Sequence, residues 1–426
     1  MCRPPRIQAN LEERTALRGL PAAFVGCVRP PSNRKALMPP ASNAKTKRYA
    51  GYFWGGVLPM VRFSPFVCYM LLVLMRSANQ ECMAQVPNSN GTMPTKAWAE
   101  HVAKEKSSLR GLFAIDRNTA WACGSEGTII RCRNATLPNI AFDVFAISGF
   151  EKSEFRSIHA WDADTCIVAT AGQPANIFKT TDGGKTWKTV FSSDHAASFL
   201  NGLKFFNPSE GVVFGDPISG CLELLVTSNS GDSWKRLNVE NSPPVLDGEA
   251  GFAASNSSML LLRDDVWIGL GGRDGVARIL RCSDFRKNAQ HNNRLHWSSV
   301  EIPFLASSPS RGIFSLASAG QSVVAVGGDY KEMDNKNGTI AVSDLAGKSW
   351  RVPVLQSTRG FRSCVIFSAT DHQWITVGPT GSDAATELDR WQPLSDMGFH
   401  TLHVASDGSV WAAGAGGRVG RWTDPK

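Results

Sequence analysis

A short apolar run that ends in glycine recurs along most of this chain and limits its possible folds. The glycines are Gly124, Gly172, Gly215, Gly271, Gly327, Gly378 and Gly414. Subtracting successive residue numbers gives spacings of 48, 43, 56, 56, 51 and 36 residues, close to the roughly 40 to 50 residues of a four-stranded propeller blade. Helical periodicity is nearly absent from Trp98 onward, where β-branched and aromatic runs alternate with turns. The sequence therefore predicts an all-β chain that forms a seven-bladed β-propeller over residues 98–426.

A second motif follows several of these glycines and has the composition of a tight hairpin turn. Residues 180–187 (TTDGGKTW) match the pattern S/T-x-D-x-G-x-S/T-W, and residues 227–234 (TSNSGDSW) match it with Asn in place of Asp. Such an Asx side chain can cap its own turn, the glycine can take a positive φ, and the Trp can pack between blades. We therefore interpret the motif as a turn staple rather than a ligand or calcium site. Its residues are Thr180, Asp182, Gly184, Trp187, Asn229, Gly231, Trp234 and, in a degenerate copy, Trp350.

These residues resemble the Asp-box, or BNR-type, repeat. The phasing of glycine and Trp is similar to that of the propeller family of photosystem II stability/assembly factors, and the resemblance spans about residues 98–424. It implies a non-catalytic platform that docks a protein segment. A further copy of the motif begins at Cys282 and is stretched by a polar insertion before Trp297.

The last repeat predicts how the ring closes. It runs from His400 through Trp411 to Trp422 and leaves room for three strands rather than four. The segment WAEHV at residues 98–102 resembles the strands that begin at the other repeat Trp residues. We therefore expect this N-terminal strand to join the last blade, which removes the open edges of the ring.

The net charge of +8 belongs to the N-terminal region. Residues 1–84 hold 12 of the 45 basic residues and 3 of the 37 acidic ones, so residues 85–426 carry 33 basic and 34 acidic groups, a balance of −1. A near-neutral body lacks the basic surface that nucleic-acid binding needs. We therefore expect no nucleic-acid partner, and we expect a monomer.

Residues 60–84 have the pattern of a signal peptide. Arg62 precedes an apolar run at residues 66–75, and small residues lead up to Ala84. The run has ten residues, too few to span a bilayer. We expect export to the periplasm or the cell exterior, with residues 85–97 as a linker. The alternative is an uncleaved leader, which would be the only membrane contact. Residues 1–59 are then a disordered basic extension or a mis-called start.

The cysteines outside the leader show no CxxC pair and no Cys/His cluster at zinc spacing, so we expect no metal and no cofactor. Cys123 and Cys132 flank one short turn and could form a disulfide in an oxidising compartment. The alternative is that both are small apolar residues within strands.

The predicted starts of the innermost strands form a column of mostly large residues. In chain order they are Arg110, Arg156, Asn201, Phe252, Arg311, Arg362 and His400. Four guanidinium groups at one channel mouth would form a positive site for a carboxylate, phosphate or sulfate. We expect Arg273 and Glu249 on the same face, and an acidic peptide, a protein or an anionic glycan as partner. The alternative is that the arginines pair with Asp216, Asp329 and Asp383 to hold the blades together.

Two enzyme classes remain as alternatives. Sialidases also carry Asp boxes, and that interpretation casts Tyr330 as nucleophile with Asp329 or Glu332 beside it. An inverting glycosidase would need two separated carboxylates such as Asp216 and Asp329. Relatives of such propellers are often labelled oxidoreductases, but the runs GLGGRDG and GAGGRVG lack the spacing of a dinucleotide loop. Binding without catalysis needs the fewest assumptions.

Overall fold

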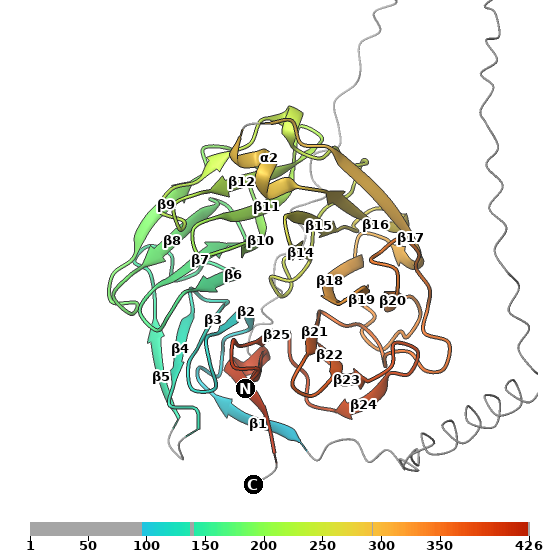
Figure 1. Cartoon of the computed structure of the whole chain (residues 1–426). Coiled ribbons are helices and arrows are strands. Elements are labelled where there is room, and N and C mark those ends of the chain that lie inside the picture. The colour runs from blue at the N-terminus through green and yellow to red at the C-terminus, as the bar shows by residue number, and fades with distance from the viewer. Residues whose placement is uncertain (1–95, 137–139, 292, 425–426) are drawn as a thin grey trace, which may run out of the picture. The chain divides into compact units, whose positions relative to one another are not determined.

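Seven small antiparallel sheets follow one another along the chain and stand as blades around a central axis (Figure 1). The computed structural model describes residues 96–136, 140–291 and 293–424. The predicted seven-bladed β-propeller is confirmed. The expectations for residues 1–59 and 60–84, and nearly all of the linker, lie outside the described residues. Among the helices of the described part of the chain, none is long and apolar enough to cross a membrane.

The first three blades each contain four strands in sequence order. The first blade is formed by β2 (Leu109–Ala114), β3 (Ala120–Gly124), β4 (Ile129–Arg133) and β5 (Ala141–Phe145). The second is formed by β6 (Phe155–Ala160), β7 (Cys166–Thr170), β8 (Asn176–Thr180) and β9 (Lys188–Ser192). The third is formed by β10 (Leu200–Phe205), β11 (Gly211–Ile218), β12 (Cys221–Thr227) and β13 (Lys235–Arg236).

The fourth blade is formed by β14 (Met259–Leu262), β15 (Asp265–Gly269), β16 (Gly275–Cys282) and β17 (Trp297–Ser307). The fifth is formed by β18 (Arg311–Ala319), β19 (Ser322–Asp329) and β20 (Ile340–Ser343). The sixth is formed by β21 (Cys364–Ser368), β22 (Gln373–Gly378), β23 (Gly381–Ala385) and β24 (Gln392–Ser395). The seventh is formed by β25 (Thr401–Val404), β26 (Val410–Ala413), β27 (Arg418–Thr423) and β1 (Ala97–Val102).

The first strand of each blade is the innermost one (Figure 1). These strands are β2, β6, β10, β14, β18, β21 and β25, and each contacts the next around the ring. Because β25 also contacts β2, they enclose a central channel. β1 pairs with β27 as the outer strand of the seventh blade, with Trp98 opposite Trp422. The Trp98 ring centroid lies 5.2 Å from that of Phe399 and 5.1 Å from that of Trp422.

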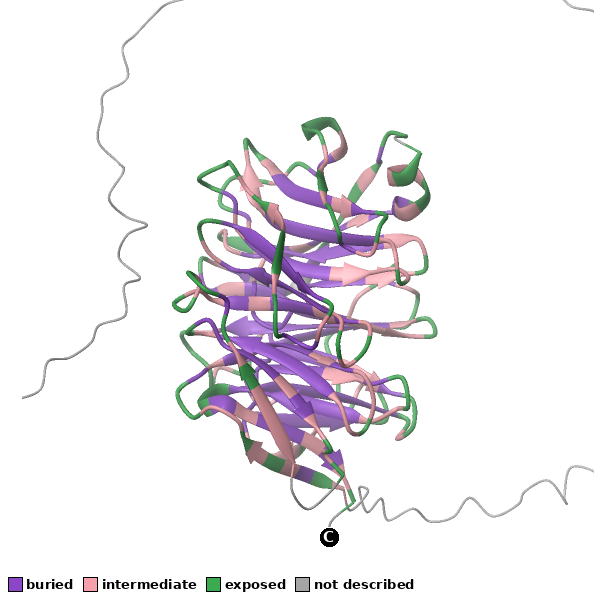
Figure 2. Cartoon of the chain, turned by 90° about the vertical axis from the view of Figure 1, so that its left-hand side faces the viewer, coloured by how far each residue is buried: buried purple, intermediate pink, exposed green. Residues whose placement is uncertain are grey.

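The core lies between neighbouring blades rather than inside any one of them. All residues of β3, β7 and β8 are buried, whereas the outer strands β5 and β9 contain no buried residue. Figure 2 shows this gradient from buried inner strands to exposed turns. Each blade is therefore held by the apolar faces of its two neighbours.

Glycine recurs at this position because the backbone of another segment occupies the place where a Cβ atom would lie. A Cβ at Gly124 would collide with the carbonyl oxygen of Ser108, and one at Gly378 with that of Phe361. In the fourth blade, β15 ends at Gly269, so Gly271 lies two residues beyond the strand that the repeat assigned to it. The reason is that Gly271 makes room for the backbone of Gly312 in the next blade.

The two predicted staple turns contain the hydrogen bonds of a self-capped hairpin. The Thr186 N–H donates to Asp182 Oδ1 over 2.9 Å, and the Gly184 N–H donates to Thr180 Oγ1 over 3.0 Å. The turn at Asn229 repeats both contacts, to Asn229 Oδ1 at 3.1 Å and to Thr227 Oγ1 at 3.1 Å. The tryptophans pack against core clusters between blades: Trp187, Trp234 and Trp350.

Cys123 and Cys132 are free thiols on opposite faces of the first blade. Cys132 in β4 pairs with Ala120, whereas Cys123 pairs with Ile129. Their side chains enter different core clusters, so a disulfide between them would require the strand register to change. The interpretation as small apolar residues in strands is confirmed.

The polar insertion of the fourth blade contains a short helix, α2 (Phe285–Gln290). Phe285 anchors it, because its ring is buried 6.0 Å from the ring of Trp297 and 6.1 Å from that of Phe206. Two 3-10 turns complete the described helical elements, η2 (Val239–Asn241) and η3 (Ala415–Gly417).

Candidate functional site

Four of the predicted site residues occupy equivalent places at the start of an innermost strand. The registers of β2, β6 and β10 each shift by one residue, which makes Arg110, Arg156 and Asn201 the extra residue of a β-bulge. The His400 N–H donates to Ala413 O over 2.8 Å just before β25, which is the same arrangement. A bulge twists the strand locally and redirects a side chain. We therefore expect these four side chains to project from their blades in similar directions.

Phe252 and Arg311 are not equivalent to these residues, and their alignment in the sequence was wrong. β14 begins at Met259, seven residues after Phe252. In the fifth blade the bulge falls at Phe314, three residues beyond Arg311. Arg311 instead donates through Nη2 to Asn337 O over 2.7 Å.

The segment of residues 252–258, here called the plug, explains the misalignment because it crosses the channel instead of starting a strand (Figure 1). Asn256 accepts from the Leu203 N–H through Oδ1 over 2.8 Å and donates through Nδ2 to Ile158 O over 3.0 Å. Ser255 Oγ donates to Ser363 O over 2.7 Å, and Ser255 O accepts from Thr401. The plug is thus bonded to the second, third, sixth and seventh blades.

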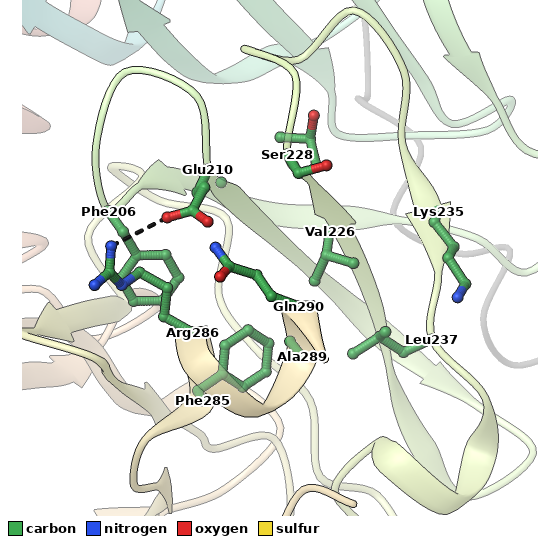
Figure 3. A pocket seen from close by; sticks show the side chains of 12 residues that line it. Phe206, Glu210, Val226, Ser228, Lys235, Leu237, Phe285, Arg286, Ala289 and Gln290 are labelled. Carbon is green, nitrogen blue, oxygen red and sulfur yellow. Dashed lines mark hydrogen bonds and ion pairs between the residues drawn. The ribbon is translucent and has the colours of Figure 1, made fainter. Parts of the chain in front are cut away.

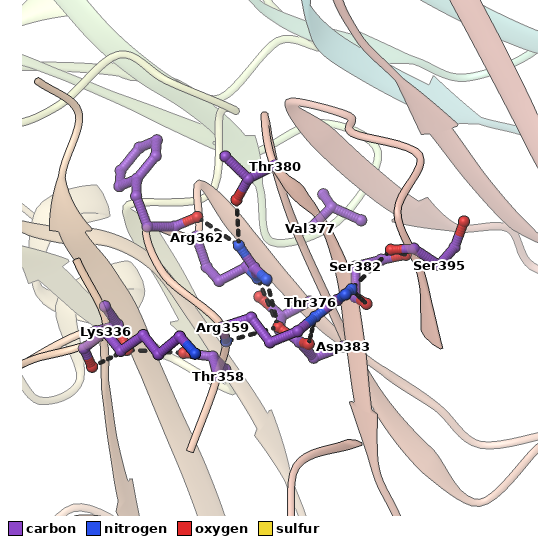
Figure 4. Close-up of polar contacts among 12 residues, drawn as sticks. Lys336, Thr358, Arg359, Arg362, Thr376, Val377, Thr380, Ser382, Asp383 and Ser395 are labelled. Carbon is purple, nitrogen blue, oxygen red and sulfur yellow. Dashed lines mark hydrogen bonds and ion pairs between the residues drawn. The ribbon is translucent and has the colours of Figure 1, made fainter. Parts of the chain in front are cut away.

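Arg362 is part of a buried ionic network rather than an open site (Figure 4). It is fully buried and forms an ion pair of 2.6 Å with Asp383, which is 1% exposed. Arg359 donates through Nε to the other oxygen of the same carboxylate over 2.8 Å. Burial lowers the pKa of Arg362 and the charge of Asp383 opposes that shift. The bulge position of this blade belongs to Ser363, whose N–H donates to Val377 O.

Glu249 is likewise engaged in structure, in a buried ion pair with Arg278. Its carboxylate receives Nε of Arg278 over 2.7 Å and Nη2 over 2.5 Å, and it is 4% exposed. Arg273 lies half-buried in the turn between β15 and β16. Among the described residues, Arg273 has no hydrogen-bond or ion-pair partner.

A group of basic side chains, here called the basic cluster, lies on the first, second and seventh blades. Its members are Arg110, Arg156, His400 and Arg418. Burial and the charge of Arg156 lower the pKa of Arg110 to about 10. Burial and the charges of Arg110, Arg418 and Arg156 lower the pKa of His400 to about 3. Arg110 and Arg156 stand at equivalent bulges of the adjacent strands β2 and β6, and β2 also contacts β25, which follows His400, and η3, which precedes Arg418. Arg418 was not found by sequence reasoning because it follows the last glycine run, in the outer half of its blade.

The basic cluster is only partly neutralised. Arg156 lies 3.4 Å from Glu154, and Arg418 lies 3.7 Å from Glu100. Both acids are at least 30% exposed, so these pairs are screened by water. Within the described part of the chain, Arg110 has no hydrogen-bond or ion-pair partner. The cluster therefore keeps a net positive charge.

Asn201 and Asp216 form a separate contact near this cluster. Asn201 Nδ2 donates to Asp216 Oδ1 over 2.8 Å, and Asn201 is 1% exposed. Its own Oδ1 is buried and receives no donor among the described residues. Asp216 thus serves here as an acceptor for Asn201.

Four aromatic residues, here called the aromatic cluster, surround the corresponding strand starts of the fourth to sixth blades. They are Phe252, Phe314, Phe361 and Tyr330. The rings of Phe252 and Phe314 are stacked with centroids 4.0 Å apart. Arg156 Nη1 donates to Ala253 O over 3.2 Å, so the basic cluster and the aromatic cluster adjoin.

Tyr330, the proposed nucleophile, lies in this aromatic cluster, whereas the proposed catalytic residue Asp216 contacts Asn201. The Tyr330 ring lies 6.5 Å from that of Phe252 and 6.3 Å from that of Phe314. Asp329 is 8% exposed and accepts from the Lys331 N–H over 2.9 Å. Among the described residues, no carboxylate is hydrogen-bonded to the Tyr330 hydroxyl. No group of three His, Cys, Asp or Glu side chains gathers as a metal site in this part of the chain.

A separate cavity of about 470 Å³ lies at the rim, between the third blade and α2 (Figure 3). Its apolar wall includes Phe206, Val226 and Phe285. At its edge Arg286 forms an ion pair of 3.1 Å with Glu210. This cavity could not be predicted from the sequence, since it depends on how the insertion folds back onto the neighbouring blade.

Comparisons with known proteins bear on the fold. No family model matches the chain, and no curated protein matches it. A solved structure described as YCF48 bound to D1 peptide matches with a TM-score of 0.51 at 14% identity, covering 76% of this chain and 94% of that one. YCF48 from Cyanidioschyzon merolae matches with a TM-score of 0.52 at 17% identity, covering 76% and 98%. The resemblance to photosystem II assembly propellers is therefore confirmed at the level of the fold.

Proposed function

We propose that this chain is a binding platform that docks an acidic segment of a partner protein on the basic cluster at one mouth of the channel. The observation that carries the proposal is the guanidinium of Arg110, which lies beside Arg156 and has no partner in the described part of the chain. Two adjacent guanidinium groups repel each other unless an anion lies between them. Carboxylates suit that place because guanidinium binds them through two parallel hydrogen bonds.

The adjoining aromatic cluster favours a peptide over a simple ion. Phe252 and Tyr330 are half-buried and offer apolar contact next to the charged groups. Rigid aromatic side chains and arginine are the residues that most often dominate binding to proteins. The solved YCF48 structure with a bound D1 peptide supports this mode of binding on a propeller of the same fold. The proposal needs no cofactor and no catalytic residue.

Export of the chain forms part of the proposal. The apolar run at residues 66–75 and the small residues before Ala84 support a cleaved signal peptide. The N-terminal sequence of the protein isolated from cells tests this part. A mature chain that begins at Gln85 is expected, and a chain that still carries Met60 would contradict it.

A titration of the purified chain with a fluorescent acidic peptide tests the docking proposal. The peptide carries several Asp or Glu residues and one Leu or Phe, and an amide version replaces each acid with Asn or Gln. We expect the Arg110→Ala/Arg156→Ala double variant to bind the acidic peptide at least about tenfold more weakly than wild type, since each charged contact contributes on the order of 1 to 3 kcal/mol.

Arg133→Ala is the matched control, because Arg133 lies on β4 and its partner Asp143 keeps an ion pair of 2.9 Å with Arg131. This variant should bind like wild type. Equal binding of the acidic peptide and its amide version would rule the proposal out. Competition by a sulfated glycan but by no acidic peptide would assign the site to glycans instead.

A further inference from the structure

A second ring of residues lies on the innermost strands, three positions beyond the bulge position in every blade except the fourth, whose strand β14 has no bulge. Each innermost strand contributes one residue to it: Phe113, His159, Lys204, Leu261, Ala317, Ile366 and His403. All seven are half-buried, although their strand neighbours on the N-terminal side are buried. Three of them are basic, four are apolar and none is acidic.

The plug separates this second ring from the basic cluster. Asn256 binds backbone groups of Ile158 and Leu203, which directly precede His159 and Lys204. The basic cluster residues Arg110 and Arg156 lie further toward the start of the innermost strands, on the opposite side of the plug. The channel interior is therefore a chamber of its own, distinct from the mouth where the peptide is proposed to bind.

Two adjoining cavities, of about 400 and 380 Å³, occupy the chamber. Both are lined by Phe113, His159, Phe205 and His403, and the second also by Lys204. Among the described residues, no Asp or Glu lines either cavity. Cavities of this size accept a small organic molecule.

Aromatic rings form the wall of the chamber around the two imidazoles. The Phe113 ring lies 4.4 Å from that of His159 and 4.3 Å from that of His403. His159 also lies 4.6 Å from the Phe205 ring and 4.8 Å from the Trp161 ring. The wall thus offers flat apolar surfaces around a polar centre.

The polar centre holds three basic groups, and no acidic side chain among the described residues pairs with them. The His403 Nδ1 accepts from the Ala114 N–H over 3.1 Å, which leaves Nε2 to carry the proton of the neutral ring. Among the described residues, Lys204 has neither a hydrogen bond nor an ion pair. Burial lowers the pKa of Lys204, and burial with the nearby basic groups lowers the pKa of both histidines to about 3.

We propose that this chamber is a second binding site, for a small aromatic carboxylate whose carboxylate pairs with Lys204 and whose ring packs among Phe113, Phe205 and Trp161. An ammonium group that is partly removed from water is costly without a partner, and the described residues supply none. A carboxylate provides the missing charge, and Nε2–H of His403 is a further donor for it. The site is independent of the peptide proposal, because the plug and different residues separate the two.

Calorimetric titration of the full chain with benzoate, phenylacetate and indole-3-acetate tests the proposal, with benzamide and inorganic phosphate as comparison ligands. At least one aromatic carboxylate should bind, and benzamide and phosphate at least tenfold more weakly. Lys204→Met should lower the affinity of that carboxylate at least tenfold. Lys188→Met, at an exposed position of the outer strand β9, should leave it unchanged.

Absence of binding by all three carboxylates, or unchanged binding by Lys204→Met, would overturn the proposal. Equal binding of phosphate would overturn the assignment to aromatic ligands. The thermal midpoint of Lys204→Met gives a second measurement that does not depend on the ligand chosen. Removal of an unpaired buried charge should raise the midpoint in the ligand-free protein, and a lowered midpoint would mean that Lys204 already has a partner.

Discussion

At the scale of single residues, two arginines of similar sequence context have opposite roles. Arg110 is half-buried and has no partner in residues 96–136, 140–291 and 293–424, whereas Arg362 is fully buried with Asp383. Both precede a small residue and an apolar one, so local sequence does not distinguish them. The difference arises from Arg359 and Asp383, which meet Arg362 only in the folded sixth blade.

Arg362→Ala should therefore destabilise the protein without affecting binding directly. It leaves the buried Asp383 with Arg359 as its remaining ionic partner, and loss of one partner of a buried pair costs about 3 to 5 kcal/mol. Urea unfolding followed by tryptophan fluorescence measures the change. Arg133→Ala, at a more exposed pair, should cost well under about 1 kcal/mol. Equal stability of the two variants would contradict the buried-network role.

At the scale of strands and turns, the sequence predicts the structure best at positions where the local geometry permits only one residue type. Glycine recurs because carbonyl oxygens such as Ser108 O fill the place of its Cβ, so the repeat reveals the number of blades. The prediction fails at the plug, since nothing local distinguishes Phe252 from the start of a strand. The chamber residues were missed, although Lys204 and His159 lie at a fixed offset from Asn201 and Arg156.

The N-terminal strand β1 offers a test at this scale. Trp98 is 8% exposed and packs on Phe399 and Trp422, whereas Val102 of the same strand is 51% exposed. Trp98→Ala should lower the free energy of unfolding by about 3 to 5 kcal/mol. Val102→Ala should change it by less than about 0.5 kcal/mol. If Trp98→Ala melted like wild type in a thermal scan, β1 would contribute little to the seventh blade.

At the scale of the whole molecule, charge is unevenly distributed in a near-neutral propeller. Basic groups meet at the mouth and in the chamber, where His159, His400 and His403 have pKa values lowered to about 3. Their ordinary pKa is 6.5, so between these values the unfolded chain binds more protons than the folded one. Stability is therefore present above pH 6.5 and is lost as the pH falls toward 3.

Thermal midpoints measured between pH 7 and pH 4 should fall steadily. Each buried histidine contributes on the order of 1 kcal/mol per pH unit in that window. His403→Gln should reduce the slope, and His195→Gln, at an exposed position, should leave it unchanged. A midpoint that stays constant from pH 7 to pH 4 in the wild type would contradict the lowered pKa values of these imidazoles.

A reciprocal charge swap tests most directly whether the basic cluster is the docking site. Arg110→Glu/Arg156→Glu is titrated with the acidic peptide and with a version in which each acid is replaced by Lys. The variant is predicted to lose the acidic peptide and to bind the basic one more tightly than wild type does, because the sign of the interaction reverses. Wild-type affinity of the variant for the acidic peptide would contradict the account.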